Sequence, residues 1–139
     1  MKKNDPISKT MSANVLSIQE GQNLSDVRNL MCEAHIHHVP IVQGKKLSGL
    51  VSFTDLMKIN LVISGADERT INAIIDQQFT IKDIMSTNIT TIKSSDTVRH
   101  ASEILARGAF HSLPVVDDEG NLVGIVTSTD LIRYLNDQY

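Results

Sequence analysis

The sequence of 139 residues predicts an α/β (α+β) fold: two pseudo-symmetric repeats, each ordered β-α-β-β-α, packed through their sheets into one module. One observation is a stretch of the form Gly-h-h-Ser/Thr-x-x-Asp-Leu, with h apolar, that occurs twice. A second is that Met11-Ser12 recurs as Met85-Ser86, an offset of 74 residues that also aligns two His-x-x-Pro segments. A third is that apolar residues recur at helical spacing at the same offset. Matched identities and matched periodicity together indicate internal duplication.

The first strand and the first helix of each repeat follow from apolar spacing. Residues 15–18 and 89–92 are short apolar runs that predict strands. Residues 24–34 and 98–107 place apolar side chains at helical spacing, which predicts amphipathic helices. A strand, helix and strand in this order form a crossover, which is normally right-handed.

The next two strands are expected to form a hairpin-like pair. Residues 37–42 and 111–116 predict the first strand of each pair, and turns at Gln43-Gly44 and Glu119-Gly120 lead to the Gly-h-h strand. Pro40 and Pro114 lack an N–H, so each is expected where the ladder needs no donor. The closing helices begin near Thr54 and Thr129.

The Gly-h-h-Ser/Thr-x-x-Asp stretch predicts a buried strand that runs directly into a helix. Ser52 with Asp55, and Thr127 with Asp130, have the spacing of a helix-start capping arrangement. A helix start of this kind presents backbone N–H groups and the positive end of the helix dipole, which suits an anion such as a phosphate.

The repeats are joined by a segment that we expect to be structured. The predicted division is 1–64 for the first repeat with its lead-in, 65–80 for a helical connector and 81–139 for the second repeat. Ile59, Val62 and Ile63 extend the closing helix, and Gly65 can end it. Asp67 can cap a further helix, whose isoleucine face either covers the core or meets a partner subunit. That face consists of Ile71, Ile74 and Ile75.

Composition excludes several classes of function. The net charge is −3 and aromatic residues are 4%, which disfavours nucleic acid and anionic membranes as partners. No apolar run is long enough for a membrane span and no signal peptide is evident, so a cytoplasmic protein is expected. Cys32 is the only cysteine, so zinc sites built on several cysteines are excluded. We expect Cys32 to be an inert buried thiol, because it lies near the apolar face of its helix.

No catalytic constellation is recognisable in the sequence. It contains no nucleophile beside a base at a known spacing, no Walker-type Gly-Lys-Ser/Thr and no Gly-x-Gly-x-x-Gly. His35, His37 and His38 form a cluster that a metal could use. However, neighbouring strand side chains point to opposite faces, so His37 and His38 do not easily share one ion. We expect neither an enzyme nor a metal site.

The order of these motifs, repeated from about Ile7 to about Asn136, resembles a tandem pair of CBS domains (the cystathionine β-synthase type), also called a Bateman module. The resemblance implies two clefts between paired sheets that hold adenosine compounds. It names AMP, ADP or ATP as the expected ligand, with S-adenosylmethionine and NAD as further candidates and no required cofactor. It also implies a homodimer and a regulated partner protein.

The resemblance assigns the ligand contacts residue by residue. Asp55 and Asp130 match the carboxylate that binds ribose, and an acceptor-only carboxylate suits a 2′,3′-diol. Each can instead be a first-turn residue favoured by the helix dipole. Ser52 and Thr127 match the hydroxyl that holds phosphate or ribose oxygens, and helix capping is a compatible alternative. Thr is the more usual residue there, which favours the second repeat as the better site.

Further contacts are implied next to these residues. His37 and His111, with Val39 and Leu113 directly before the prolines, match the segment whose backbone recognises adenine edges. A protonated histidine there can meet a phosphate, or simply face water at the cleft mouth. Ser17 and Thr91 match contacts to base or sugar, with an ordinary strand role as the alternative. The remaining candidates for phosphate contact, which can equally be solvated, are Arg99, Arg107 and Arg133.

Three functions are therefore to be compared. The first is a regulatory module that binds an adenine nucleotide and transmits occupancy to a partner protein by a population shift between lobe arrangements. The second is a dimerisation or scaffolding module that needs no ligand. The third is a small hydrolase or metalloenzyme, which the absence of a catalytic motif disfavours.

Overall fold

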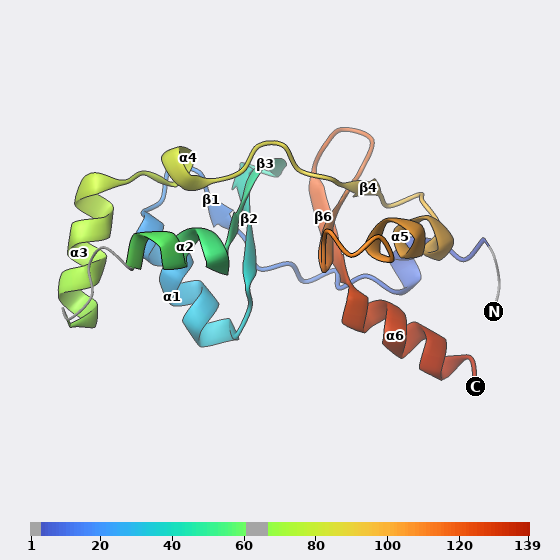
Figure 1. Ribbon diagram of the computed structural model, residues 1–139. Coiled ribbons are helices and arrows are strands. Elements are labelled where there is room, and N and C mark those ends of the chain that lie inside the picture. The colour runs from blue at the N-terminus through green and yellow to red at the C-terminus, as the bar shows by residue number, and fades with distance from the viewer. Residues whose placement is uncertain (1–3, 61–66) are drawn as a thin grey trace. The chain divides into compact units, whose positions relative to one another are not determined.

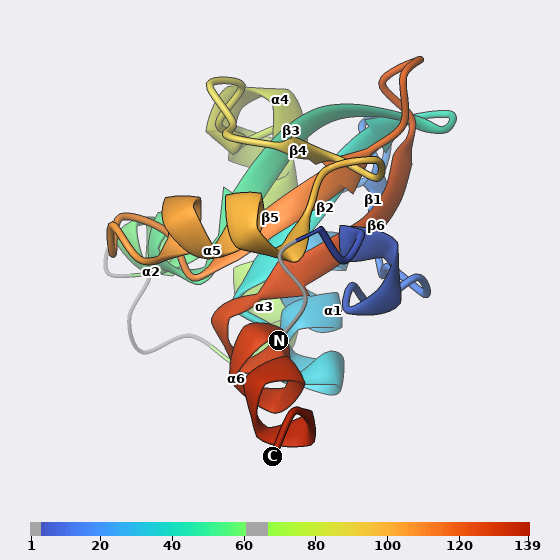
Figure 2. The ribbon, with the colours of Figure 1, turned by 90° about the vertical axis from the view of Figure 1, so that its right-hand side faces the viewer.

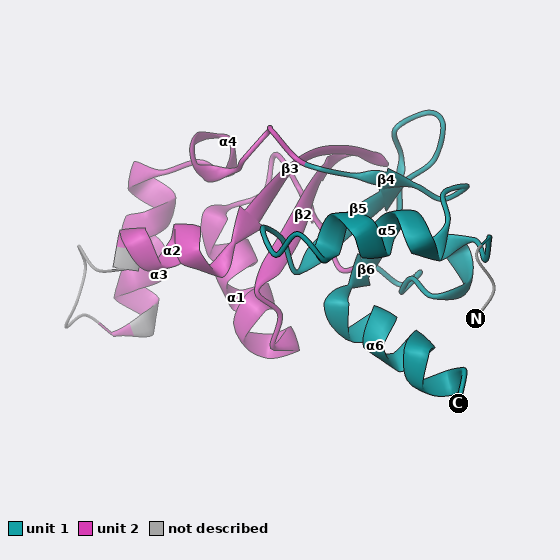
Figure 3. Ribbon diagram, turned by 45° about the vertical axis from the view of Figure 1, so that its right-hand side comes forward, with its two compact units in different colours: residues 1–15, 90–139 teal, residues 16–89 magenta. Residues whose placement is uncertain are grey.

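The computed structural model describes residues 4–60 and 67–139, which form two compact units (Figure 3). Unit 1 comprises Met1–Val15 with Thr90–Tyr139, and unit 2 comprises Leu16–Ile89. The first repeat therefore lies in unit 2, and the second repeat lies in unit 1 together with the chain's N-terminal segment. Both units mix helices with one three-stranded sheet, as the α/β (α+β) prediction requires.

Unit 2 has a sheet of order β1-β2-β3, in which β1 is parallel and β3 antiparallel to β2 (Figure 1). Its elements are β1 (Ile18–Gln19), α1 (Leu24–Ala34), β2 (His38–Gln43), β3 (Lys46–Ser52), α2 (Phe53–Asn60), α3 (Glu68–Gln78) and α4 (Ile81–Ile84). The hairpin between β2 and β3 turns at Gly44, whose φ of 63° is in the left-handed region that favours glycine.

Unit 1 repeats this arrangement with the sheet order β4-β5-β6. Its elements are the 3₁₀ helix η1 (Ile7–Lys9), β4 (Ile92–Lys93), α5 (Val98–Leu105), β5 (Ser112–Val116), β6 (Leu122–Thr127) and α6 (Ser128–Asp137). The helix α6 continues directly from the end of β6 (Figure 2). The predicted order β-α-β-β-α is thus confirmed in both repeats.

Several predicted boundaries were wrong. The first strands are residues 18–19 and 92–93 rather than 15–18 and 89–92, because only these residues pair with the next strand. The second strands begin at His38 and Ser112, one residue later than predicted. The helix α5 ends at Leu105 rather than at residue 107, just before Gly108 with its φ of 80°.

Each lead-in segment packs into the core around the sheet of the repeat that it does not precede. Ile7 precedes the first repeat but is fully buried in the core of unit 1, which surrounds the second repeat's sheet. Ile81 precedes the second repeat and is fully buried in the core of unit 2. Burying one isoleucine contributes about 1.5–3 kcal/mol. The boundaries of the two compact units therefore differ from the sequential division 1–64, 65–80 and 81–139.

The N-terminal lead-in also makes polar contacts within unit 1. The carbonyl of Asp5 accepts the Val98 N–H at 2.8 Å, which satisfies a free donor at the start of α5. The Asp5 carboxylate accepts the Tyr134 hydroxyl of α6. That hydrogen bond is the main reason why the pKa of Tyr134 is raised above its usual value.

The recurring Met-Ser pair explains the proline position in each sheet. In unit 2, Leu50 exchanges N–H···O bonds of 3.0 and 2.9 Å with Ser86, so its backbone polar groups point away from Pro40 opposite it. In unit 1, Ile125 does the same with Ser12, at 3.0 and 2.8 Å, opposite Pro114. Each proline thus faces a partner that needs no donor, which confirms the prediction.

The methionine of each pair packs on the repeated glycine. A Cβ placed on Gly49 would clash with Met85 Sδ and would lie 2.8 Å from Met85 Cγ. A Cβ on Gly124 would clash with Met11 Sδ in the same way. The glycines of the Gly-h-h stretches are therefore required for close approach rather than for a special backbone angle.

The connector helix α3 covers the core of unit 2. Asp67 caps it by accepting the Thr70 N–H at 2.7 Å, as predicted, and Ile75 is fully buried. Asp76 accepts the backbone N–H of Ser25 at 2.8 Å, which ties α3 to the start of α1. Within the described residues, the isoleucine face thus covers the core. The predicted roles of Val62, Ile63 and Gly65 lie outside the described residues.

The methionine–glycine contact predicts a stability effect. Gly49→Ala should lower the free energy of unfolding by about 1–3 kcal/mol, because the new methyl group overpacks against Met85. Urea denaturation measures the change. Gly21→Ala is the matched control, because a Cβ there meets nothing within 4 Å.

The double variant Gly49→Ala/Met85→Ala isolates the clash. It should lose less stability than the sum of its two single variants, because removal of the methionine side chain makes room for the new methyl group. Strictly additive losses would show that the two side chains do not compete for space.

Candidate functional site

The candidate site in the second repeat is the junction between β6 and α6. Thr127 is the N-cap of α6, and its Oγ1 accepts the Asp130 N–H at 3.1 Å. In return, the Thr127 N–H donates to Asp130 Oδ2 at 2.9 Å. This reciprocal capping box satisfies two backbone donors where the strand becomes a helix. The Asp130 side chain is only 15% exposed, so its orientation is well fixed.

The first repeat builds the same junction between β3 and α2. The Ser52 N–H donates to Asp55 Oδ2 at 3.0 Å, and Ser52 Oγ accepts the Asp55 N–H at 3.1 Å. The predicted capping arrangement is therefore confirmed for Ser52 with Asp55 and for Thr127 with Asp130. It does not exclude ligand contact, because each carboxylate uses only Oδ2 in its capping box. Ribose binding by Oδ1 stays a prediction.

A third capping box offers a comparison, because it does not follow directly from a sheet strand. At the start of α4, the Thr80 N–H donates to Asp83 Oδ2 at 3.0 Å, and Thr80 Oγ1 accepts the Asp83 N–H at 3.2 Å. The hydrogen bond from the Thr80 backbone, assisted by its hydroxyl, holds the pKa of Asp83 below its usual value. The local geometry is thus shared, and what distinguishes the two candidate junctions is their place at the end of a sheet strand.

The structure brings each predicted histidine to its junction. The carbonyl of His37 accepts the Phe53 N–H at 2.7 Å, and the carbonyl of His111 accepts the Ser128 N–H at 2.9 Å. Both imidazoles are exposed. The His37 ring stacks on Phe53, with centroids 5.5 Å apart, whereas the second repeat has Ser128 at that place. The two junctions therefore share a backbone arrangement but differ in their aromatic surroundings.

The residues directly before the prolines are placed differently from the histidines. The side chains of Val39 and Leu113 are fully buried in the cores of their own units. Only their backbone atoms remain for the predicted adenine contact, which stays a prediction. Ser17 and Thr91 lie just before β1 and β4, in the same units as Asp55 and Asp130 respectively.

One sequence prediction about side-chain burial was wrong. Cys32 is exposed, because it follows Met31 on α1 and is turned away from the buried face of that helix.

Among the residues that the structure describes, no three or more His, Cys, Asp or Glu side chains are grouped to hold a metal ion. His35 ends α1 in the left-handed conformation, with a φ of 55°. In residues 4–60 and 67–139, no helix is both long and apolar enough to cross a bilayer.

Of the three candidate arginines, only Arg133 contacts a candidate site residue. Its Nη1 lies 3.4 Å from Asp130 Oδ1, the oxygen outside the capping box. Arg99 instead pairs with Glu103 on its own helix at 3.1 Å. Arg107 is exposed in the turn after α5. Sequence reasoning treated the three alike, because nothing in the sequence shows which arginine faces the junction carboxylate.

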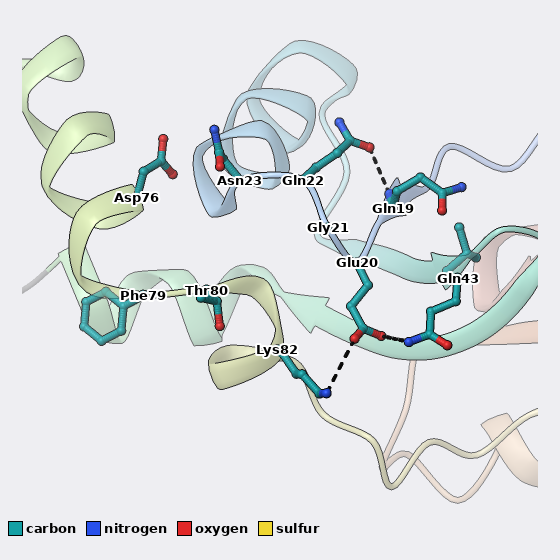
Figure 4. A pocket seen from close by; sticks show the side chains of 11 residues that line it. Gln19, Glu20, Gly21, Gln22, Asn23, Gln43, Asp76, Phe79, Thr80 and Lys82 are labelled. Carbon is teal, nitrogen blue, oxygen red and sulfur yellow. Dashed lines mark hydrogen bonds and ion pairs between the residues drawn. The ribbon is translucent and has the colours of Figure 1, made fainter.

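A cavity of about 490 Å³ in unit 2 was not predicted from the sequence (Figure 4). It lies beside the loop from β1 to α1 and is lined by Glu20, Gln43, Asp76 and Lys82 among others. These polar groups already have partners: Gln43 Nε2 donates to Glu20 at 3.0 Å, Lys82 Nζ lies 3.9 Å from Glu20, and Asp76 accepts from Ser25. None of the predicted ligand contacts lines this cavity.

Comparison with known proteins identifies the repeats. The family model for the CBS domain matches residues 7–61 and 81–137. A homoserine O-acetyltransferase from Methanocorpusculum labreanum is 32% identical over 122 residues, which cover 87% of this chain and 22% of that enzyme. The chain thus spans about a fifth of that relative's length.

Solved structures confirm the fold. Protein MJ1225 from Methanocaldococcus jannaschii has a TM-score of 0.80 and 25% identity, covering 97% of this chain and 49% of that one. The CBS domain pair of protein MJ0100, solved with 5′-methylthioadenosine and S-adenosyl-L-methionine, has a TM-score of 0.72 and 25% identity. That match covers 94% of this chain and 98% of the other.

Proposed function

Because this chain belongs to the CBS domain family, with repeats at residues 7–61 and 81–137, we propose that it is a regulatory module that binds an adenosine-containing ligand. The ligand is an adenine nucleotide of the AMP, ADP or ATP class. Its ribose binds Asp130, and the junction at Asp55 is the second site. The complex of the MJ0100 pair with 5′-methylthioadenosine and S-adenosyl-L-methionine supports an adenosine-containing ligand. Occupancy is transmitted to a partner protein.

The observation that carries the proposal is the carboxylate oxygen that lies outside the capping box at each junction. Asp130 Oδ2 is engaged by the Thr127 N–H, which fixes the carboxylate and leaves Oδ1 to accept hydrogen bonds from a diol. The Thr127 hydroxyl accepts the Asp130 N–H and retains its own hydrogen for a ligand oxygen. The positive end of the α6 dipole adds attraction for a phosphate.

The proposed activity is binding without catalysis. The matched enzyme relative is a homoserine O-acetyltransferase, but the similarity covers only 22% of its length. Its reaction is therefore not transferred to this chain. The two junction carboxylates are accounted for by helix capping and sugar recognition, and neither needs an acid–base role.

A second copy of this chain is the proposed assembly partner. Ile132 and Leu135 on α6 are 67% and 40% exposed, and they line a hollow of about 400 Å³ together with Tyr139. Ile132 and Leu135 lie three residues apart on α6, a spacing with which one helix docks on another, and Tyr139 follows the end of this helix. Met57, at the place of Ile132 in the first repeat, is also exposed. These faces equally favour the alternative function, a dimerisation or scaffolding module that needs no ligand.

Ligand binding separates the two functions. AMP, ADP, ATP, S-adenosylmethionine and NAD should be tested by thermal shift on the purified chain. A ligand at 100 times its dissociation constant should stabilise the folded state by about 2.7 kcal/mol. If none of the five raises the melting temperature, the result favours the scaffold function over the regulatory one.

The ribose contact predicts the effect of Asp130→Ala. Nucleotide affinity, measured by calorimetry, should fall tenfold to a hundredfold, because a charge-assisted hydrogen bond of about 1.5–3 kcal/mol is lost. Asp83→Ala is the matched control, since it removes a capping box of the same geometry at a site without a predicted ligand. Equal affinities of Asp130→Ala and the wild type would refute the ribose assignment.

The assembly proposal predicts the effect of Ile132→Glu. The wild type should have the mass of a dimer in light scattering, and the variant that of a monomer, because a charge in the apolar face opposes pairing. Gln77→Glu, at an exposed position on α3, should leave the dimer intact. A monomeric wild type at micromolar concentration would contradict the proposed homodimer.

A further inference from the structure

Among the described residues, Arg133 forms an ion pair with a junction carboxylate. It lies one turn after Asp130 on α6, and its Nη1 approaches Asp130 Oδ1 to 3.4 Å. The Asp130 side chain is 15% exposed and the Arg133 side chain 68% exposed. The guanidinium therefore borders the oxygen proposed for ribose while most of it faces solvent. Only one of its five donors is directed at Asp130, so the others remain for a bound molecule.

The first repeat does not reproduce this pairing. Lys58 occupies the place of Arg133 on α2, yet the described residues contain no ion pair between Lys58 and Asp55. A lysine is also a compact point charge, whereas the planar arginine fork can bind two oxygens of one phosphate. The junction at Asp130 is thus the one where an acceptor for a diol and a donor array for an anion are held together.

We infer that Arg133 makes the Asp130 junction select adenosine ligands with a 5′-phosphate over those with an uncharged 5′-substituent, an inference that rests on the proposed function. The ribose diol and its 5′-substituent are separated by one sugar ring, which a side chain as long as arginine can bridge. A 5′-phosphate would form charge-assisted hydrogen bonds with the guanidinium. The thioether of 5′-methylthioadenosine carries no charge and offers the guanidinium no anionic partner.

The contact between Arg133 and Asp130 also explains how a 5′-phosphate can be selected while Asp130 still binds the ribose. A separation of 3.4 Å is long for a charge-assisted hydrogen bond, so the guanidinium can pivot from Asp130 to a phosphate at little cost. The capping box holds the carboxylate through Oδ2 whether or not Arg133 is present. Replacement of Arg133 should therefore affect the phosphate contact far more than the diol contact.

The test compares AMP with 5′-methylthioadenosine by calorimetric titration of the wild type, Arg133→Gln and Arg99→Gln. The wild type should bind AMP at least tenfold more tightly than 5′-methylthioadenosine. Arg133→Gln should weaken AMP binding about five- to twentyfold and change 5′-methylthioadenosine binding less than twofold. Arg99→Gln is the matched control, since Arg99 is similarly exposed (64%) and pairs with a carboxylate on its own helix. It should change neither affinity.

Several outcomes would overturn the inference. If Arg133→Gln weakens both ligands equally, the arginine only positions Asp130 or stabilises α6. If AMP binding is unchanged, the guanidinium is merely solvated. If the wild type prefers 5′-methylthioadenosine, the selectivity is wrong although the proposed adenosine site holds. A wild type that binds neither compound overturns the inference as well, and the five-ligand thermal shift then shows whether the proposed function fails with it.

Discussion

In each repeat, a carboxylate accepts the N–H of the last strand residue, and the hydroxyl of that residue accepts the N–H of the carboxylate's own residue. This exchange, between Thr127 and Asp130 and between Ser52 and Asp55, sets the point at which a strand becomes a helix. It also determines which carboxylate oxygen is engaged and which is left to accept other donors. The structural role and the proposed recognition role thus use different atoms of the same side chain.

The strands that end at these junctions are held by contacts from distant parts of the chain. Ser12 and Ser86 bond to the strands next to the repeated glycines, and Met11 and Met85 pack on those glycines. The segment before the first repeat completes the core around the second repeat's sheet, and the segment before the second repeat completes the core around the first. Neither core is therefore built from one continuous repeat of the sequence. Each unit is a product of both halves of the duplication.

Much of the fold could be predicted, because its signals are local. The glycine turns, the capping pairs and the apolar spacing of α1 each depend on a few neighbouring residues, so they can be recognised in the sequence. The packing of Ile7 and Ile81 could not be predicted, because the sequence of an apolar lead-in does not indicate which of the two cores it joins. Cys32 was misplaced for a geometric reason, since a step of one residue on a helix moves a side chain from the buried to the exposed face.

The candidate site was predictable in part for the same reason. The junction hydroxyls and carboxylates follow a fixed spacing, whereas the contact of Arg133 with Asp130 depends on side-chain direction. A crystal structure grown with AMP tests the central claim most directly. It should show a ribose hydroxyl within hydrogen-bond distance of Asp130 Oδ1 while Oδ2 still accepts the Thr127 N–H. AMP bound with its ribose away from both junction carboxylates would contradict the account.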